Sequence, residues 1–256
     1  MPKYLNDFDE LHMQELLQSD VAKLREYQTL LPSYAEPKRR NRLLNGMRDY
    51  AYDAGVLSYG LDKAPATVWN FFGRSVEACL EMFAIGALPE CNTPVVLLDG
   101  VYLSVVLNLW DNARALAELK RYSPVRFEEG SFVADEVVMG YLVAFLAYLQ
   151  GKLDEAGETA RMNSRRCEQR REGFAKSFGL RSHALLSLVK EDEGSFQTSL
   201  AEIVQAHASE ARKGRLREDT RGLLCLDALA LTSLAERAGI RPAIQSPYLP
   251  LTLVKH

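Results

Sequence analysis

Apolar residues recur at three- and four-residue steps along almost the whole chain, and this helical period constrains the fold more than any other feature of the sequence. The first apolar stripe ends at Pro32 and comprises Leu17, Val21, Leu24, Tyr27 and Leu31. Pro37, Pro65 and Pro94 stand at the start of later stripes, and proline is favoured in the first turn of a helix. The pattern predicts an all-α fold.

The stripes give the expected helical ranges. They fall at 17–31, 37–59, 65–88, 95–107, 138–149, 153–167, 171–190, 196–207 and 219–238. Asp111 is expected to cap a short helix over 112–121, and residues 123–134 are expected to form a loop. Two alternatives stay open: the β-branched run at 95–107 also suits a strand, and Gly179 could break its helix.

Short turns favour antiparallel helical hairpins. Gly151 separates two stripes, and residues 148–156 resemble the turn of a tetratricopeptide unit. The 219–238 segment is apolar almost all round, so we expect a central core helix that ends at Gly239. The hairpins would surround this helix, with solenoid-like stacking left open, and residues 241–256 would form an extended tail. We expect a single domain over 1–256, with 88–94 as the only candidate boundary.

Composition and charge exclude several classes of protein. The 34 acidic and 31 basic residues give a net charge of −3, which argues against direct binding of nucleic acid. The four cysteines form no CxxC pair, so we expect reduced thiols rather than a zinc site or disulfides. Residues 1–10 lack the apolar core of a secretory signal, and no segment is apolar enough to span a membrane. A cytoplasmic location is expected.

Catalytic and metal-binding motifs are absent from the sequence. It contains no GxSxG, Walker A, GxGxxG, HExxH or DxDxDG pattern, so no cofactor is expected. His12 and Glu15 are one helical turn apart, but an ordinary surface pair is favoured over a metal site. His207 continues an apolar stripe and is interpreted as a histidine at the edge of the core. Asp227 faces apolar neighbours, which predicts a bond to an arginine or a helix N-terminus rather than a catalytic acid.

Charged clusters are the remaining candidates for binding. The basic run at 165–171 suggests phosphate, although a solvated helix face is favoured because no aromatic residues interleave. Acidic side chains could instead meet a basic protein partner. The candidate partner-binding residues are Glu128, Glu129, Glu191, Asp192 and Glu193, with a further acidic cluster at Asp7, Asp9 and Glu10.

Three segments in the last third of the chain resemble a known family. They are Ser195-Phe196-Gln197 with Leu200-Ala201-Glu202, the apolar stretch from Gly222-Leu223-Leu224 to Ala238-Gly239, and Ser246-Pro247-Tyr248-Leu249-Pro250. In order and spacing, over residues 195–253, they are similar to the bacterial polymorphic-toxin immunity proteins of the immunity protein 49 family. The residues that match the family's structural motif are His207, Gly222, Gly239, Ser246, Tyr248, Leu249 and Pro250. Asp227 and Arg241-Pro242 depart from the family's pattern.

The resemblance implies a non-catalytic protein that binds and neutralises a cognate secreted toxin, with a nuclease as one candidate class of toxin. Because nuclease surfaces are commonly basic, acidic patches on the inhibitor would speed the encounter. Two other functions stay open. One is a tetratricopeptide-like adaptor that binds a peptide or protein in a concave groove. The other is a helical enzyme whose site would require Asp227 and His207 to converge in a pocket.

Overall fold

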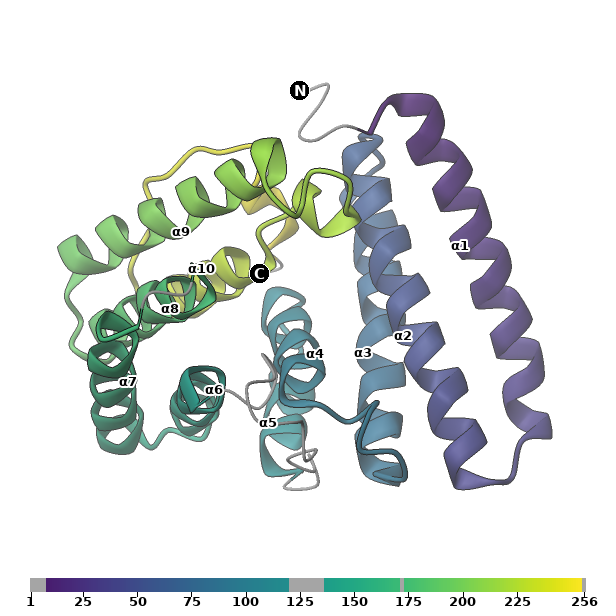
Figure 1. Cartoon of the computed structure of the whole chain (residues 1–256), viewed down its shortest axis with the longest axis horizontal. Helices are drawn as coiled ribbons and strands as arrows, with labels where there is room; N and C mark the ends of the chain where they lie inside the picture. The colour runs from purple at the N-terminus through teal and green to yellow at the C-terminus, as the bar shows by residue number, and fades with distance from the viewer. Residues whose placement is uncertain (1–7, 120–135, 171–172, 255–256) are drawn as a thin grey trace.

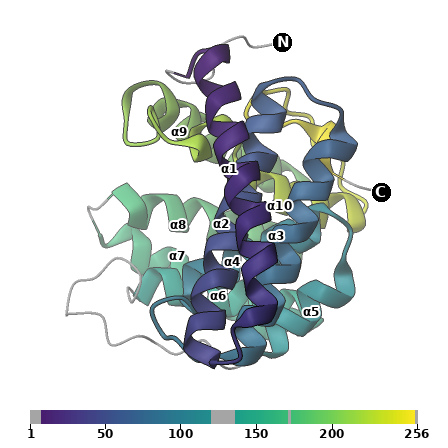
Figure 2. The same ribbon diagram turned by 90° about the vertical axis from the view of Figure 1, so that its right-hand side faces the viewer.

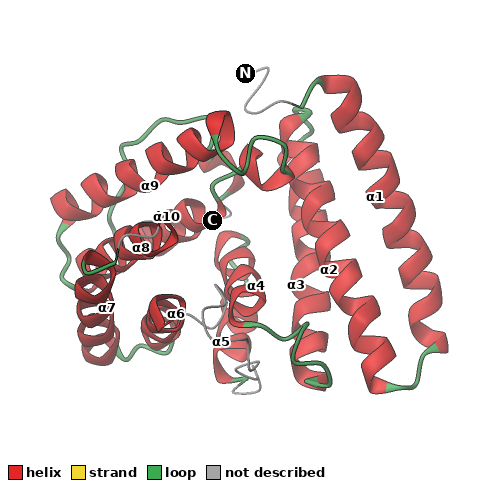
Figure 3. Ribbon diagram, in the orientation of Figure 1, coloured by secondary structure: helices red, strands yellow, loops and turns green. Residues whose placement is uncertain are grey.

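The computed structural model describes residues 8–119, 136–170 and 173–254, and the named elements in this part of the chain are all helices (Figure 3). The α-helices are α1 (Glu10–Leu30), α2 (Pro37–Gly60), α3 (Pro65–Ile85), α4 (Pro94–Val106), α5 (Trp110–Glu118), α6 (Glu136–Leu149), α7 (Leu153–Glu168), α8 (Gly173–Val189), α9 (Glu193–Lys213) and α10 (Leu226–Arg237). Short 3-10 helices are η1 (Leu31–Ser33), η3 (Thr220–Leu223) and η4 (Leu251–Leu253). These elements confirm the predicted all-α fold.

Helices that follow one another in the chain pack side by side (Figure 1). The first three helices form one row, which Figure 2 shows from its outer face with α1 nearest the viewer. Helices α7, α8 and α9 pack in sequence at the other end of the molecule, and α4 and α10 lie between the two groups (Figure 1). The chain therefore brings its C-terminal helix back into the middle of the array.

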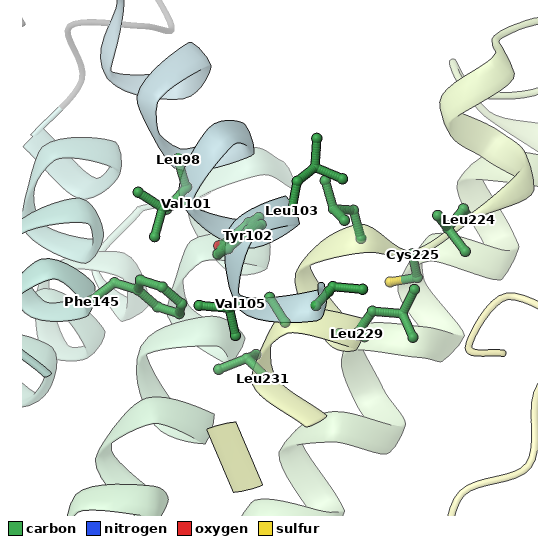
Figure 4. Close-up of a cluster of buried hydrophobic side chains, with 14 of the residues drawn as sticks. Leu98, Val101, Tyr102, Leu103, Val105, Phe145, Leu224, Cys225, Leu229 and Leu231 are labelled. Atoms are coloured by element: carbon green, nitrogen blue, oxygen red, sulfur yellow. The ribbon is translucent and has the colours of Figure 1, made fainter. Parts of the chain in front are cut away.

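Helix α10 is the central core helix that its apolar sequence predicted. Every residue from 226 to 235 is buried, and the helix packs against α4, α8 and α9. Figure 4 shows Val105 of α4 and Leu231 of α10 directed toward each other. The Ser233 hydroxyl donates a hydrogen bond of 2.9 Å to the Val105 carbonyl. Each leucine buried in this way contributes about 1.5–3 kcal/mol to stability.

The 95–107 segment is a helix rather than a strand. Thr93 caps α4 through its side chain, which accepts a hydrogen bond from the Val96 amide at 3.3 Å. A capped first turn with Pro94 inside it favours the helix over the β-branched propensity of the segment. The prediction for the next helix was wrong in one respect. Leu109 precedes α5, and Asp111 lies within the first turn instead of capping it.

The structure resolves one open alternative and corrects one boundary prediction. Helix α8 runs unbroken through Gly179, and this glycine lets α8 approach α7 closely: a Cβ atom there would lie 3.0 Å from the Cys167 Cβ. Residues 219–225 do not belong to the last α-helix. Asp219 caps η3 by accepting from the Arg221 amide at 2.9 Å, and Leu224 is extended before α10 begins at Leu226.

The 88–94 segment does not interrupt the apolar core, which is continuous from Phe8 to Val254. Asn92 on this segment donates to the Met82 carbonyl at 2.9 Å, as does Asn41 of α2. Two side chains from different parts of the chain therefore meet at the end of α3 and hold the segment against it. The expected loop at 123–134 lies outside the described residues.

Candidate partner-binding surface

A polar cluster lies where α8 meets the start of α10. The Arg181 guanidinium donates from Nε to Asp227 Oδ2 at 2.5 Å, and its Cζ atom lies 4.5 Å from the centre of the Phe178 ring. The other oxygen, Asp227 Oδ1, accepts from the Cys225 thiol and the Ala228 amide, each at 3.0 Å. The structure thus gives Asp227 both partners proposed for it, an arginine and the N-terminus of a helix.

Charge pairing decides the ionisation of this cluster. Burial raises the pKa of Asp227, but Arg181, the Cys225 thiol, His207 and the Ala228 amide together outweigh burial and hold that pKa below its usual value. Burial lowers the pKa of Arg181, and the Asp227 carboxylate together with Tyr102, Tyr141 and Cys225 more than reverses this effect. The nearby Cys225 thiol has its pKa raised well above its usual value, chiefly by burial. Asp227 is therefore a buried, paired carboxylate, as the sequence predicted, and the pair is structural.

His207 packs at the edge of the same region. Its ring lies 5.4 Å from the Tyr248 ring in an edge-to-face arrangement, and its Nε2 contacts the Gly222 carbonyl at 3.2 Å. Burial lowers the pKa of His207, so the ring is neutral at pH 7. Two hollows on the protein surface adjoin Leu153, and neither His207 nor Asp227 lines them. A neutral histidine beside a carboxylate already committed to Arg181 does not form a general acid–base pair.

The family-motif residues of the tail fasten it to the rest of the protein. Tyr248 and Leu249 are each 1% exposed, and the Tyr248 carbonyl accepts from the Cys225 amide at 2.9 Å. Side chains of α2 and α3 reach the same segment: the Tyr59 hydroxyl donates to the Pro247 carbonyl, and the Trp69 indole donates to the Leu253 carbonyl at 2.9 Å. The tail therefore links α2 and α3 to the start of α10.

The remaining motif residues shape turns on either side of α10. Gly239 has φ +83° and ends α10, as predicted. Ser246 and Leu249 form an isolated antiparallel bridge, and Pro250 precedes η4. The Gly222 carbonyl is the acceptor that faces His207. The residues of the family motif thus have structural roles.

The predicted acidic partner-binding residues are only partly described. Glu128 and Glu129 lie outside the described residues. Glu191 and Asp192 lie in the turn between α8 and α9, Glu193 is the first residue of α9, and all three are exposed. Asp192 is occupied there as the cap of α9, because it accepts from the Ser195 amide at 3.0 Å and from the Ser195 hydroxyl at 2.7 Å. Its carboxylate has a structural role, and the structure does not test whether the turn contacts a partner.

The basic run predicted at 165–171 has partners within the protein at two of its arginines, and Arg171 lies outside the described residues. Arg166 pairs with Glu136 of α6 at 3.3 Å, and Arg170 lies 5.4 Å from the centre of the Phe174 ring. Arg165 is exposed on α7. Within the described part of the chain, no group of three or more histidine, cysteine, aspartate or glutamate side chains could hold a metal ion. The described helices also include none that could cross a membrane.

The structure brings together five aspartates that the sequence analysis did not single out. They come from α1, α2, α4 and the residue before η3, and are Asp20, Asp49, Asp53, Asp99 and Asp219. Arg48 and Arg221 are the cations among them: Arg48 lies 3.5 Å from Asp99, and Arg221 pairs with Asp219 at 2.6 Å. We call the five aspartates the aspartate cluster.

Crowding changes the ionisation of the aspartate cluster. Burial and then the charge of Asp53 raise the pKa of Asp20 to about 7. Burial raises the pKa of Asp99 to about 6, although Arg48 lowers it in part. Asp53 accepts a hydrogen bond of 2.5 Å from the Thr220 hydroxyl, which joins α2 to η3. The cluster therefore contributes to the contact between the N-terminal helices and the C-terminal segment.

A groove runs along one end of the protein. It consists of two neighbouring hollows of about 270 and 260 Å³ that share Leu153, whose side chain is 48% exposed. The first hollow lies between α7 and α8 and includes Leu186, Val189 and Lys190. The second lies where α5, α6, α7 and α10 meet and includes Trp110, Tyr148 and Arg237. We call this feature the Leu153 groove.

The comparison with protein families identifies the chain. The model of immunity protein 49 matches residues 59–253. The chain belongs to the immunity protein 49 family. No curated protein and no solved structure matches the chain. The family match begins near the end of α2, so α1 and most of α2 precede the region shared with the immunity protein 49 family.

Sequence reasoning did not find the Leu153 groove or the aspartate cluster. Both unite residues that lie far apart in the chain, such as Trp110 with Arg237 and Asp53 with Asp219. One local signal was available for the groove. Leu153 is an apolar residue at the first position of a helix, beside the exposed turn at Gly151, where a side chain has little of the core to contact.

Proposed function

We propose that this protein is the non-catalytic inhibitor of a cognate bacterial toxin, which it neutralises by direct binding in the cytoplasm. Membership of the immunity protein 49 family is the observation that carries this proposal. The structure is compatible with it in two ways. The polar residues nearest to a catalytic arrangement, Asp227 and His207, take part in structural contacts, and the protein offers a preformed surface groove.

A nuclease is one class of toxin that suits the charge of the protein. Its net charge is −3, and the aspartate cluster concentrates carboxylates in one region. Nuclease surfaces that bind nucleic acid are basic, so an acidic inhibitor would be attracted to them over distances of about 10 Å at moderate salt. We expect the protein to bind the toxin and not nucleic acid itself.

Co-expression tests the proposed function. The product of the neighbouring gene is expressed in a naive bacterial host with and without this protein, and growth and the integrity of cellular nucleic acid are followed. We expect toxicity that only this protein relieves, and a one-to-one complex of the two purified proteins. A toxin that kills equally in its presence, with both proteins shown to be expressed, would reject the role in immunity.

A tetratricopeptide-like adaptor remains the alternative, since helices that pack in sequence can present a groove to a peptide. It predicts binding to a partner that is not toxic when expressed alone. Measuring growth with the partner alone therefore separates the two functions.

A further inference from the structure

The Leu153 groove has the composition of a protein-binding site. Its second hollow places the Trp110 ring, Tyr148 and two arginines, Arg114 and Arg237, around one depression. The Arg237 guanidinium lies over the indole, with its Cζ atom 4.2 Å from the ring centre. Tryptophan, tyrosine and arginine are the residues most enriched among those that contribute most to binding energy at protein interfaces.

The floor of the groove is apolar and already formed. Leu234 of α10 is 1% exposed and lies at the base of the second hollow, while Val189 and Leu186 of α8 line the first. Leu153 stands between the two hollows and is half-exposed. All these residues lie on helices packed against the core, so their ordering on binding would cost little conformational entropy.

The charge of the groove differs from that of the whole protein. The residues that line it include four cationic side chains and two acidic ones, whereas the chain carries a net charge of −3. Both acidic residues, Asp154 and Glu158, lie on the α7 side of the first hollow. The second hollow is lined by Arg114 and Arg237 and by no acidic residue, although Arg114 pairs at 3.3 Å with Asp111 beside it. Arg237 is the cation over Trp110, and its charge favours a partner that presents a carboxylate at this point.

We propose that the Leu153 groove is the toxin-binding surface, and that it receives an apolar side chain of the toxin that stands beside an aspartate or glutamate. The apolar side chain occupies the second hollow against Trp110 and Leu234, and the carboxylate pairs with Arg237. This inference rests on the proposed function, because it takes the cognate toxin as the partner. It differs from the sequence-based expectation, which assigned binding to the acidic residues at 128–129 and 191–193.

The test compares two groove variants with two matched controls in the full-length protein. Leu153→Asp and Arg237→Glu alter the groove. Met162→Asp and Arg165→Glu are the controls, because Met162 is 55% exposed on the same helix as Leu153, Arg165 is also exposed there, and neither residue lines the groove. The probe is the purified toxin encoded by the neighbouring gene, and the Kd is measured by calorimetry together with the Tm of each variant.

We expect each groove variant to raise the Kd at least about thirtyfold while its Tm stays close to that of the unmodified protein. The controls should change the Kd less than about threefold. A toxin variant in which the paired carboxylate is replaced by lysine should bind Arg237→Glu more tightly than it binds the unmodified protein.

Other results would overturn the inference. If the unmodified protein binds the toxin and both groove variants bind equally well, the binding surface lies elsewhere and the proposed function still stands. Loss of binding in Asp20→Asn or Asp53→Asn, with the groove variants unaffected, would assign binding to the aspartate cluster. If the unmodified protein does not bind the toxin at all, both the inference and the proposed function fail.

Discussion

Arg181 of α8 and Asp227 of α10 are joined by a hydrogen-bonded ion pair, with side chains that are only 20% and 11% exposed. The two residues are 46 positions apart in the chain. The Phe178 ring lies against Arg181, and the Ala228 amide donates to Asp227. Each charge is thus compensated on more than one side, which buried charges require.

Removing one partner of this pair should destabilise the protein strongly. We expect Asp227→Ala to lower the free energy of unfolding by about 3–5 kcal/mol, because Arg181 would keep a buried charge without its carboxylate. Urea unfolding at pH 7.5 measures the change. The control is Glu26→Ala, which removes an exposed pair with Lys23 and should leave the free energy of unfolding nearly unchanged. The double variant Arg181→Met with Asp227→Leu should recover most of the lost stability. A double variant as unstable as Asp227→Ala would contradict the explanation.

The C-terminal tail should be necessary for stability. Tyr248 is almost fully buried, so we expect Tyr248→Ala to cost about 3–5 kcal/mol, as other losses of a large buried ring do. Truncation before Ser246 removes this ring together with the carbonyls that accept from Tyr59, Trp69 and Cys225. Thermal unfolding should show a markedly lower Tm for the truncated chain. Replacement of the exposed Arg241 with alanine is the control, and a truncated chain as stable as the full one would refute this role of the tail.

Stability should increase as the pH falls from 8 to 6. The pKa of Asp20 is raised to about 7 and that of Asp99 to about 6, so the folded protein binds protons in this range that the unfolded chain, with carboxyl pKa values near 4, does not. Proton uptake by the folded state stabilises it as the pH decreases. Two effects oppose this trend. The lowered pKa of His207 destabilises the folded state as the pH falls through about 6.5, but it is one group against two aspartates, and the lowered pKa of Asp227 matters only below the usual carboxyl pKa. Tm measured across this range checks the sign.

Asp20→Asn should reduce that pH dependence and stabilise the protein at pH 8. The expected gain is about 1 kcal/mol, because water screens a half-exposed carboxylate from its neighbours. Asp111→Asn is the control, since the Asp111 side chain is 97% exposed. If Asp20→Asn left the slope of Tm against pH unchanged, the aspartate cluster would not be its source.

Two helical glycines should respond in opposite ways to substitution by alanine. At Gly179 the added Cβ would lie 3.0 Å from the Cys167 Cβ, so α7 and α8 would have to move apart, at a cost of about 1–3 kcal/mol. At Gly73 of α3 no atom lies within 4 Å of the added Cβ, and alanine should stabilise the helix by about 0.5–1 kcal/mol. Urea unfolding of the two variants compares them directly. Stabilisation by Gly179→Ala would show that the close approach of the helices is not needed.

The sequence by itself determined the helices and many of their limits. Thr93 and Pro94 start α4, Gly151 and Gly239 end helices with positive φ angles, and the apolar residues of 226–235 predict a central helix. These features depend on local backbone geometry and on the period of apolar residues, and both can be recognised within one segment of the sequence. The burial and pairing of Asp227 were also predicted, because a carboxylate among leucines requires a partner.

Only the tertiary structure decided which residues meet. Nothing local in the sequence indicates that Asp227 pairs with Arg181, that Asp20 lies beside Asp53, or that Trp110 and Arg237 form one side of a groove. Gly179 shows the same limit, because its role depends on a neighbouring helix rather than on its own. Contacts between distant segments arise from how whole helices pack, and that packing sums many weak side-chain contacts that no single stretch of sequence contains.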